Sequence, residues 1–204
     1  RCTSRGLGDV YKRQVSNLLL AGGHFGKPGA GACPVRGHSN VQGDRTVGVN
    51  HNPTEDFISS CESETGINMP RKKGYDVVEF IHAALQGRVR TFMALGGNLV
   101  SAMSDTERVA KAISNIDLTV QISTKLNRSH LITGKEALIL PCLGRTEIDP
   151  AGFVSVENSM GLVHSSEGSL KPASKNLLSE PEIISRIGKE PVSYTHLTLP
   201  TIAV

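Results

Sequence analysis

The chain has 204 residues, of which 38% are hydrophobic and 20% are charged, and its formal net charge is +3. The first 14 residues carry all of that net charge, so the rest of the chain lacks a basic footprint for nucleic acid or for an anionic membrane. No apolar run approaches the ~20 residues that a membrane-spanning helix needs. Beyond the N-terminal stretch there are three widely spaced cysteines, which argues against a disulfide framework and for a reducing, cytoplasmic compartment.

The two ends of the chain carry no apolar period, and both resemble translated sequencing adapter. Asp9 to Gln14 back-translates as GAT GTG TAT AAG AGA CAG, and the reverse complement of that DNA, read in another frame, encodes Val192 to His196. Two protein termini have no physical reason to encode opposite strands of one DNA element. We therefore expect residues 1–14 and 191–204 to be non-native tails that pack against nothing, and residues 15–190 to be an internal part of a longer protein.

A polar, glycine-rich stretch over residues 31–48, GACPVRGHSNVQGDRTVG, fits neither a helix nor a strand. Its glycines and Asn40 permit left-handed backbone and a close approach to a ligand. Arg36 is a fixed cation whose bidentate fork suits a carboxylate or a phosphate. On an extended path, alternating polar side chains would point to one side: His38, Asn40, Gln42 and Asp44. We predict that the stretch binds a polar cofactor or substrate; a solvated loop is the alternative.

Two helices are predicted next by apolar spacing, over residues 76–86 and 104–114. Each begins with a capping-box pattern, in which a Ser or Asp is followed three residues later by a Glu. The two pairs are Asp76 with Glu79 and Ser104 with Glu107. Gly87 predicts the end of the first helix.

Strand patterns alternate with these helices. They cover residues 89–95, 118–122 and 137–141. A weaker helix is predicted over residues 127–134, a long polar loop over residues 145–178, and one more helix from residue 179. Alternating strands and helices predict an α/β fold, a Rossmann-like parallel sheet with crossover helices, present here as a partial domain.

Parallel sheets bind ligands at the carboxyl ends of their strands. Gly96, Gly97 and Asn98 end the first predicted strand, where paired glycines let backbone N–H groups approach an anion or a base edge and the next helix would add its positive N-terminus. The turn after the next strand, residues 121–125 (QISTK), is also polar. We predict that both turns lie on one edge of the sheet and bind a nucleotide-like ligand; plain structural turns are the alternative.

Cysteine and histidine side chains allow further interpretations. A zinc site could use Cys33, His24 and His38, although no two of them have ligand spacing. Cys142 follows a strand and could be a nucleophile, but no base is evident, and a small buried hydrophobe is the favoured interpretation. The remaining histidines are predicted to be ordinary surface or cap residues: His51, His82, His130 and His164.

The stretch AGGHFGKPGAGACPVRGHSNVQGDRTVG resembles the corresponding segment of molybdopterin-dependent oxidoreductases of the dimethyl sulfoxide reductase superfamily, above all formate dehydrogenase alpha subunits. Its PVRG-x-x-NVQG core carries the resemblance. LGGNLVSAMSD resembles the family's Gly-Glu-Asn-Pro turn, and VQISTKLNRSHLITGKEALILPCLGRTEID resembles the following turn, strand and loop. The resemblance covers nearly all of residues 15–190. It implies a bacterial molybdenum enzyme that oxidises formate or a similar small substrate and passes electrons to an iron–sulfur cluster.

Carried over by position, the resemblance gives catalytic roles to Arg36, which would hold the formate carboxylate, and to His38. His38 replaces another polar residue of formate dehydrogenases, which leaves a different small substrate open. The implied cofactor is a bis-molybdopterin guanine dinucleotide with molybdenum. The residues that would bind it are Gly37, Asn40, Gln42, Gly43, Gly96, Gly97, Asn98, Gln121, Ser123 and Thr124. Gly97 replaces the family's Glu and Leu99 its Pro, so the backbone would make that contact. The ligand to molybdenum (Cys or selenocysteine) and the cysteines of a 4Fe-4S cluster would precede Val15.

Two other function classes stay open. One is a non-catalytic nucleotide-binding or assembly protein with the same fold, because fold does not fix function. The other is a stress or acid-resistance relative that keeps the cofactor and has lost formate turnover. In every case the fragment alone is expected to be inactive, and an electron-acceptor subunit is a candidate partner of the parent.

Overall fold

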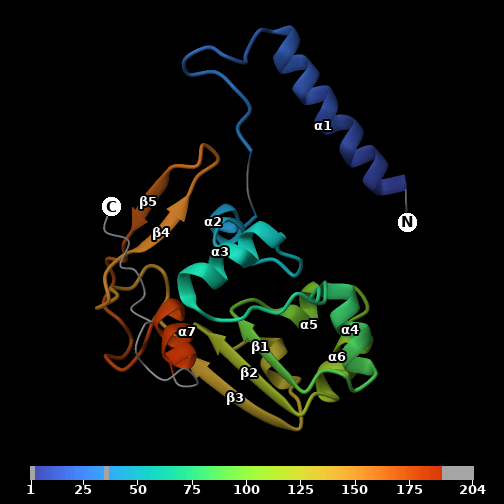
Figure 1. The fold of residues 1–204 in the computed structure, drawn as a ribbon, viewed down its shortest axis with the longest axis vertical. Helices are drawn as coiled ribbons and strands as arrows, with labels where there is room; N and C mark the ends of the chain where they lie inside the picture. The colour runs from blue at the N-terminus through green and yellow to red at the C-terminus, as the bar shows by residue number, and fades with distance from the viewer. Residues whose placement is uncertain (1–2, 35–36, 190–204) are drawn as a thin grey trace.

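The computed structural model describes residues 3–34 and 37–189, and in the first helix it describes side chains from Val10 onward. This part of the chain has a mixed α/β fold with a three-stranded parallel sheet and a separate two-stranded antiparallel sheet (Figure 1). Within it, no helix combines the length and the apolar character that crossing a membrane requires.

The larger sheet has the order β1-β2-β3, with β1 (Thr91–Leu95) and β3 (Glu136–Pro141) each pairing in parallel with β2 (Leu118–Ser123). Val120 in β2 lies opposite Met93 and Leu138. The three predicted strands and their parallel arrangement are therefore confirmed. Because β2 lies between two strands and under helices on both faces, most of its residues are buried, which is typical of parallel sheets.

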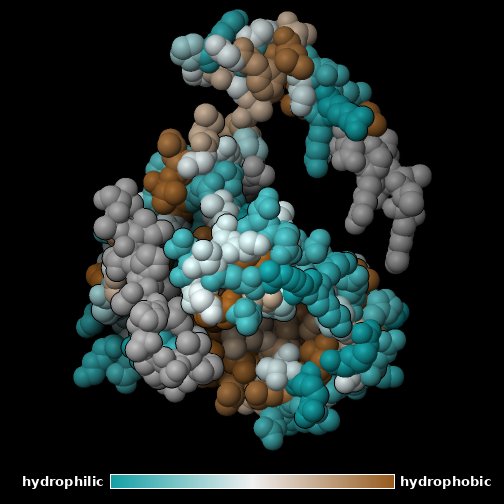
Figure 2. All heavy atoms as spheres, in the orientation of Figure 1, coloured by the Kyte–Doolittle hydropathy of each residue, from teal (hydrophilic) through white to brown (hydrophobic). Residues whose placement is uncertain are grey.

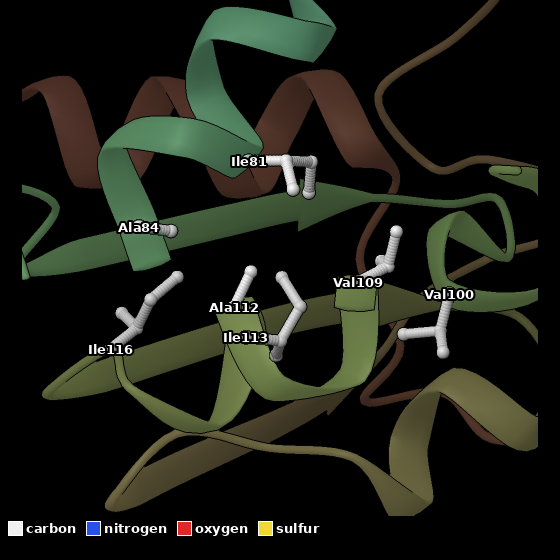
Figure 3. Packing of buried hydrophobic residues seen from close by; sticks show 7 residues of the cluster. All are labelled: Ile81, Ala84, Val100, Val109, Ala112, Ile113 and Ile116. Carbon is white, nitrogen blue, oxygen red and sulfur yellow. The ribbon is translucent and has the colours of Figure 1, made fainter. Parts of the chain in front are cut away.

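Helices α4 (Val77–Leu85) and α6 (Thr106–Ser114) cover one face of this sheet and pack on each other. Their buried side chains, with Val100 of α5 (Leu99–Ala102) and Ile116 after α6, form a cluster that Figure 3 shows between the helices and the strands. Its members are Ile81, Ala84, Val100, Val109, Ala112, Ile113 and Ile116. The capping box that begins α4 is confirmed: the Glu79 N–H donates to Asp76 Oδ1 (2.8 Å) and the Asp76 N–H donates to Glu79 Oε2 (2.9 Å). Gly87 ends the helix with a φ of 69°.

The predicted start of α6 is wrong by one residue. Asp105, not Ser104, is the N-cap, and its Oδ1 accepts the N–H of Arg108 (3.3 Å). Asp caps a helix as well as Ser does and here lies next to the first helical residue. A short helix that the sequence did not predict, α5 (Leu99–Ala102), lies between β1 and Asp105.

The opposite face of the sheet is covered by α7 (Glu180–Lys189), which was predicted. Ile183 of α7 packs with Val120, Ile122 and Cys142. One helix does not cover the whole face: Met93, Leu95 and Leu138 remain 40–52% exposed. In Figure 2 hydrophobic surface is visible between the polar helices, in the region of these strands. The sheet thus has a buried centre and open flanks.

The helix predicted over residues 127–134 is a single 3-10 turn, η1 (Arg128–Leu131). Gly134 follows it in close contact with the neighbouring loop, since a Cβ on Gly134 would lie 2.5 Å from the Ile116 carbonyl oxygen. The Gly134 N–H also donates to Thr119 Oγ1 (3.1 Å). This close packing brings the chain back to the start of β3.

The prediction that residues 145–178 form one long loop is wrong, because this segment contains an antiparallel hairpin of β4 (Val154–Glu157) and β5 (Val163–Ser166). Asn158 forms its turn, with Oδ1 accepting the N–H groups of Met160 and Leu162. Most of the strand residues are exposed or half-buried and few are apolar. Each strand has only four residues, and although β4 (VSVE) alternates, β5 (VHSS) does not, so the local pattern is too short to predict a hairpin.

Three N-terminal helices were also not predicted: α1 (Thr3–Ala21), α2 (Val41–Thr46) and α3 (Glu55–Thr65). Helix α1 crosses the predicted tail boundary at Gln14 and stands apart from the other elements (Figure 1). The side chains from Val10 to Gln14 are exposed, as expected of a segment that packs against nothing. Residues 191–204 lie outside the described part, and the adapter origin of both ends stays a prediction.

Candidate functional site

The two predicted turns lie side by side at the carboxyl edge of the larger sheet. Leu95 and Ile122 are paired at the ends of β1 and β2, and the Gly96 N–H donates to the Ile122 carbonyl oxygen (2.8 Å). Gly96 and Gly97 both have left-handed backbone, with φ of 65° and 75°. Only glycine adopts this conformation readily, so the pair of glycines is required by the turn itself.

A network of side-chain hydrogen bonds joins the first of these turns to η1 and β2. Ser129 Oγ donates to Asn98 Oδ1 (2.5 Å) and accepts the Val100 N–H (3.2 Å). Gln121 Nε2 donates to the Ser129 carbonyl oxygen (3.2 Å), and Asn127 Nδ2 donates to the Gly97 carbonyl oxygen (2.8 Å). Asn98 and Gln121 were predicted to bind cofactor. Here Asn98 Oδ1 and Gln121 Nε2 bond within the protein and support the turn, and their role toward a cofactor stays a prediction.

The side of the two turns that faces solvent is not covered by other residues in the described part of the chain. A Cβ on Gly97 would meet nothing within 4 Å, and Thr124 and Lys125 are exposed. Ser123 Oγ donates to the Lys125 carbonyl oxygen (2.7 Å), which fixes the second turn. Within the described residues, the backbone N–H groups of Gly97 and Asn98 have no protein acceptor. The edge can therefore donate backbone hydrogen bonds to an anion or to a base lying over it.

The cavity beneath the edge cannot hold a ligand. It has a volume of about 20 Å³ and is lined by Gly97, Gln121, Ser129 and His130, among others. That volume accommodates about one water molecule. Any larger ligand at this edge would therefore lie across the turns, in contact with their backbone, and not inside the sheet layer.

Glu180 is a site residue that sequence reasoning missed. It begins α7, and its Oε1 lies 3.4 Å from the position that a Cβ on Gly96 would occupy. The carboxylate is half-buried, and this burial raises the pKa of Glu180 above its ordinary value. No local pattern marks it, because only the packing of Ile183 on the sheet brings the start of α7 to this edge. A carboxylate here can accept hydrogen bonds from ribose hydroxyls or from base N–H groups.

Cys142 is a buried hydrophobe, as predicted, and not a nucleophile. It is 3% exposed and belongs to the cluster beneath α7. Burial raises the pKa of its thiol to about 11, with smaller contributions from the charges of Glu180 and Glu147. A thiol with such a pKa is almost entirely protonated at neutral pH, and the protonated form is unreactive.

The loop over residues 37–44, which was predicted to bind a polar cofactor or substrate, lies against β4 of the hairpin and not at the carboxyl edge of the larger sheet. Arg36 lies outside the described residues, and Gly37 and His38 are exposed. The extended path expected from His38 to Asp44 is wrong, because the chain turns into α2 at Val41.

The loop's polar groups bind the hairpin. Asn40 Nδ2 donates to the Ser155 carbonyl oxygen (3.4 Å), Asn40 Oδ1 accepts the Glu157 N–H (2.9 Å), and Gln42 Nε2 donates to Glu157 Oε1 (3.1 Å). Gly43 makes room for the Asn40 amide. These bonds go to β4 and not to the turns of the larger sheet.

The histidines are surface or cap residues, as predicted. His130 Nδ1 accepts the Asn127 N–H (2.9 Å) at the start of η1. The others are exposed: His51, His82 and His164. Cys33, His24 and His38, the three residues of the zinc interpretation, are exposed too. Across residues 3–34 and 37–189, no three His, Cys, Asp or Glu side chains gather as a candidate metal site.

No family model matches the chain. An uncharacterized oxidoreductase of Mycobacterium tuberculosis strain H37Rv is 52% identical over 180 residues, which are 86% of this chain and 23% of that protein. Protein YdeP of Escherichia coli strain K12 is 45% identical over 181 residues, 87% of this chain and 24% of that protein.

A more distant relative is the Bacillus subtilis protein named "Putative formate dehydrogenase YrhE", which is 27% identical over 190 residues, 89% of this chain and 19% of that protein. The chain thus spans about a quarter or less of the length of these curated relatives. It corresponds to a segment of larger proteins, several of which are named as oxidoreductases.

Proposed function

We propose that the chain is part of an oxidoreductase and that it binds a dinucleotide cofactor at the carboxyl edge of β1 and β2. The observation that carries this proposal is the left-handed Gly96–Gly97 turn, open to the outside, next to the polar turn of the neighbouring parallel strand. Parallel sheets bind nucleotides at this place because backbone N–H groups are free there. The names of the relatives support the reaction class.

The hydrogen-bond donors and acceptors at the edge match the polar groups of a molybdopterin guanine dinucleotide. The backbone of Gly96 and Gly97 would face its polar groups. Thr124 would donate a hydroxyl hydrogen bond, and Ser123 Oγ, whose proton goes to the Lys125 carbonyl oxygen, would accept one. Glu180 would accept hydrogen bonds from a ribose or from guanine, not from a phosphate, because a carboxylate repels phosphate. When bound, such a cofactor supplies a molybdenum that exchanges two electrons with a small substrate. Electrons would leave through a 4Fe-4S cluster of the parent.

The proposed substrate of the parent is formate or a similarly small molecule. Arg36 is the residue that would hold its carboxylate, since a guanidinium forms two parallel hydrogen bonds with a carboxylate. His38, exposed in the described part, would contribute to substrate selection. The distant relative named as a formate dehydrogenase supports this assignment.

The proposed function can be tested with the full-length parent protein. We would measure molybdenum, guanine nucleotide released by acid, and formate-dependent dye reduction for wild type, Arg36→Lys and Arg36→Ala. One charge-assisted pair in a dry pocket contributes on the order of 1.5–3 kcal/mol, so Arg36→Ala should lower kcat/KM roughly 10- to 150-fold. Arg36→Lys should fall between the two, because it keeps the charge and loses the fork.

The outcomes separate the alternatives. Nucleotide and molybdenum without formate turnover would indicate the stress or acid-resistance relative. Wild-type protein without molybdenum or guanine nucleotide would contradict the proposal and favour an assembly protein. An Arg36→Ala variant that loses the metal would make Arg36 a cofactor anchor instead of a substrate clamp.

A further inference from the structure

We propose that Asn40 and Glu157 are positioning residues that fasten the segment carrying Arg36 and His38 to the β4–β5 hairpin. We call the contact of Asn40 and Gln42 with Ser155 and Glu157 the Asn40–Glu157 latch. The proposal rests on the proposed function, because that function gives Arg36 and His38 their role. The latch joins residues 115 to 117 positions apart in the chain.

The Asn40 amide binds β4 as a neighbouring strand would. It donates to the Ser155 carbonyl oxygen and accepts the Glu157 N–H, two backbone groups that face the same side of a strand. The other side of β4 pairs with β5. Asn40 therefore extends the two-stranded sheet by one step with a side chain, and Gln42 adds a bond to the Glu157 carboxylate.

Gly43 shows that the sequence of the loop is fitted to this contact. A Cβ on Gly43 would lie 2.3 Å from Asn40 Oδ1, closer than two such atoms can approach. Helix α2 begins directly after Asn40 and folds back over its amide, with the Asp44 N–H donating to the Asn40 carbonyl oxygen (2.9 Å). Two polar residues of the loop, Asn40 and Gln42, and the glycine at position 43 thus hold the loop in place.

The latch limits where the catalytic segment can reach. A residue spans at most about 3.6 Å of extended chain, so the Cα of His38, two residues from Asn40, lies within about 7 Å of the Cα of Asn40. If the latch opens, the segment before Asn40 samples a larger volume, and a carboxylate clamp carried on it loses rate when its geometry is loose.

The test uses the full-length protein with Asn40→Ala, Gly43→Ala and Asn40→Asp, and with Asn176→Ala as an exposed control. Gly43→Ala breaks the latch without removing a hydrogen-bonding group. We would measure hydrogen exchange of residues 37–46 and of the Glu157 amide, guanine nucleotide per protein, and kcat/KM for formate.

We expect Asn40→Ala and Gly43→Ala to raise exchange in residues 37–46 and to lower kcat/KM about tenfold, the effect of one or two hydrogen bonds. Nucleotide content should be unchanged. Asn40→Asp keeps the acceptor for the Glu157 N–H and should fall between wild type and Asn40→Ala, while Asn176→Ala should behave as wild type.

Unchanged exchange in residues 37–46 would overturn the latch. A loss of nucleotide in proportion to activity would also overturn it, because Asn40 would then be a cofactor ligand. If the wild-type protein does not turn over formate, the proposed function fails. The exchange measurement still decides whether the latch exists.

Discussion

The sheet region, residues 76–143, and the loop–hairpin region, residues 37–48 with residues 154–166, are held together by different interactions. The sheet region buries an apolar cluster whose members come from the consecutive helices α4, α5 and α6 and the residue Ile116 that follows them. In the loop–hairpin region α2 buries no residue, and long-range side-chain hydrogen bonds hold it to β4. Hydrophobic burial stabilises the fold, whereas a few directional bonds place a polar segment at a surface. The first region should therefore tolerate surface changes and the second should tolerate almost no change at its bonding positions.

The largest effect is expected in the sheet region. Ile113 is 2% exposed at the centre of the apolar cluster (Figure 3). Ile113→Ala removes buried methyl groups and leaves a cavity, which should lower the free energy of unfolding by about 2–5 kcal/mol. Leu131→Ala is the control, since Leu131 is 82% exposed. Urea unfolding of the chain measures both, and equal losses would mean that this cluster is not the core.

Two cysteines allow the buried sheet region to be compared with the exposed chain next to the loop–hairpin region. Cys142 is buried in the sheet region with its pKa raised to about 11, and Cys33 is exposed just before the loop–hairpin region. At pH 8 a thiol of pKa about 11 has on the order of 200-fold less thiolate than an ordinary one. Because Cys142 is buried as well as mostly protonated and Cys33 is exposed, iodoacetamide should label Cys33 much faster than Cys142, as read by peptide mass spectrometry. Comparable labelling rates would show that the sheet region opens easily.

The smallest effect concerns α3, which an ion pair joins to the following chain. The Arg71 guanidinium donates to both Glu62 oxygens (2.6 and 2.8 Å), and with the Met69 N–H it lowers the pKa of Glu62 to about 2. A lowered carboxyl pKa stabilises the folded state above pH 4.5, and this contribution is lost as pH falls toward 2. Arg71 is exposed and Glu62 is only half-buried, so solvent screens the pair and the effect should be small.

Glu62→Gln should make the urea midpoint less sensitive to a change from pH 5 to pH 3. Glu64→Gln, at an exposed glutamate two residues away, should leave that sensitivity as in wild type. An identical pH dependence for wild type and Glu62→Gln would contradict the assignment of this ion pair.

The same contrast explains what the sequence could predict. The three strands and helices α4, α6 and α7 carry local signals, namely apolar spacing and the Asp76–Glu79 box, and they were found. The hairpin and α2 depend on contacts such as Gln42 with Glu157, which join distant positions and leave no local period. For the site, the two turns were predictable because strand ends mark them. Glu180 was not, because its place depends on how α7 packs.

The central claim, a dinucleotide at the carboxyl edge of the sheet, is tested most directly by two matched glycines. Gly97 and Gly87 both have left-handed backbone (φ of 75° and 69°), and a Cβ on either meets nothing within 4 Å. Gly97 lies at the carboxyl edge, and Gly87 precedes β1 at the other end. Gly97→Val and Gly87→Val should cost similar backbone strain, on the order of 1–2 kcal/mol. We predict that guanine nucleotide bound per full-length protein falls sharply in Gly97→Val and stays near wild type in Gly87→Val. Equal nucleotide content in the two variants would contradict the account.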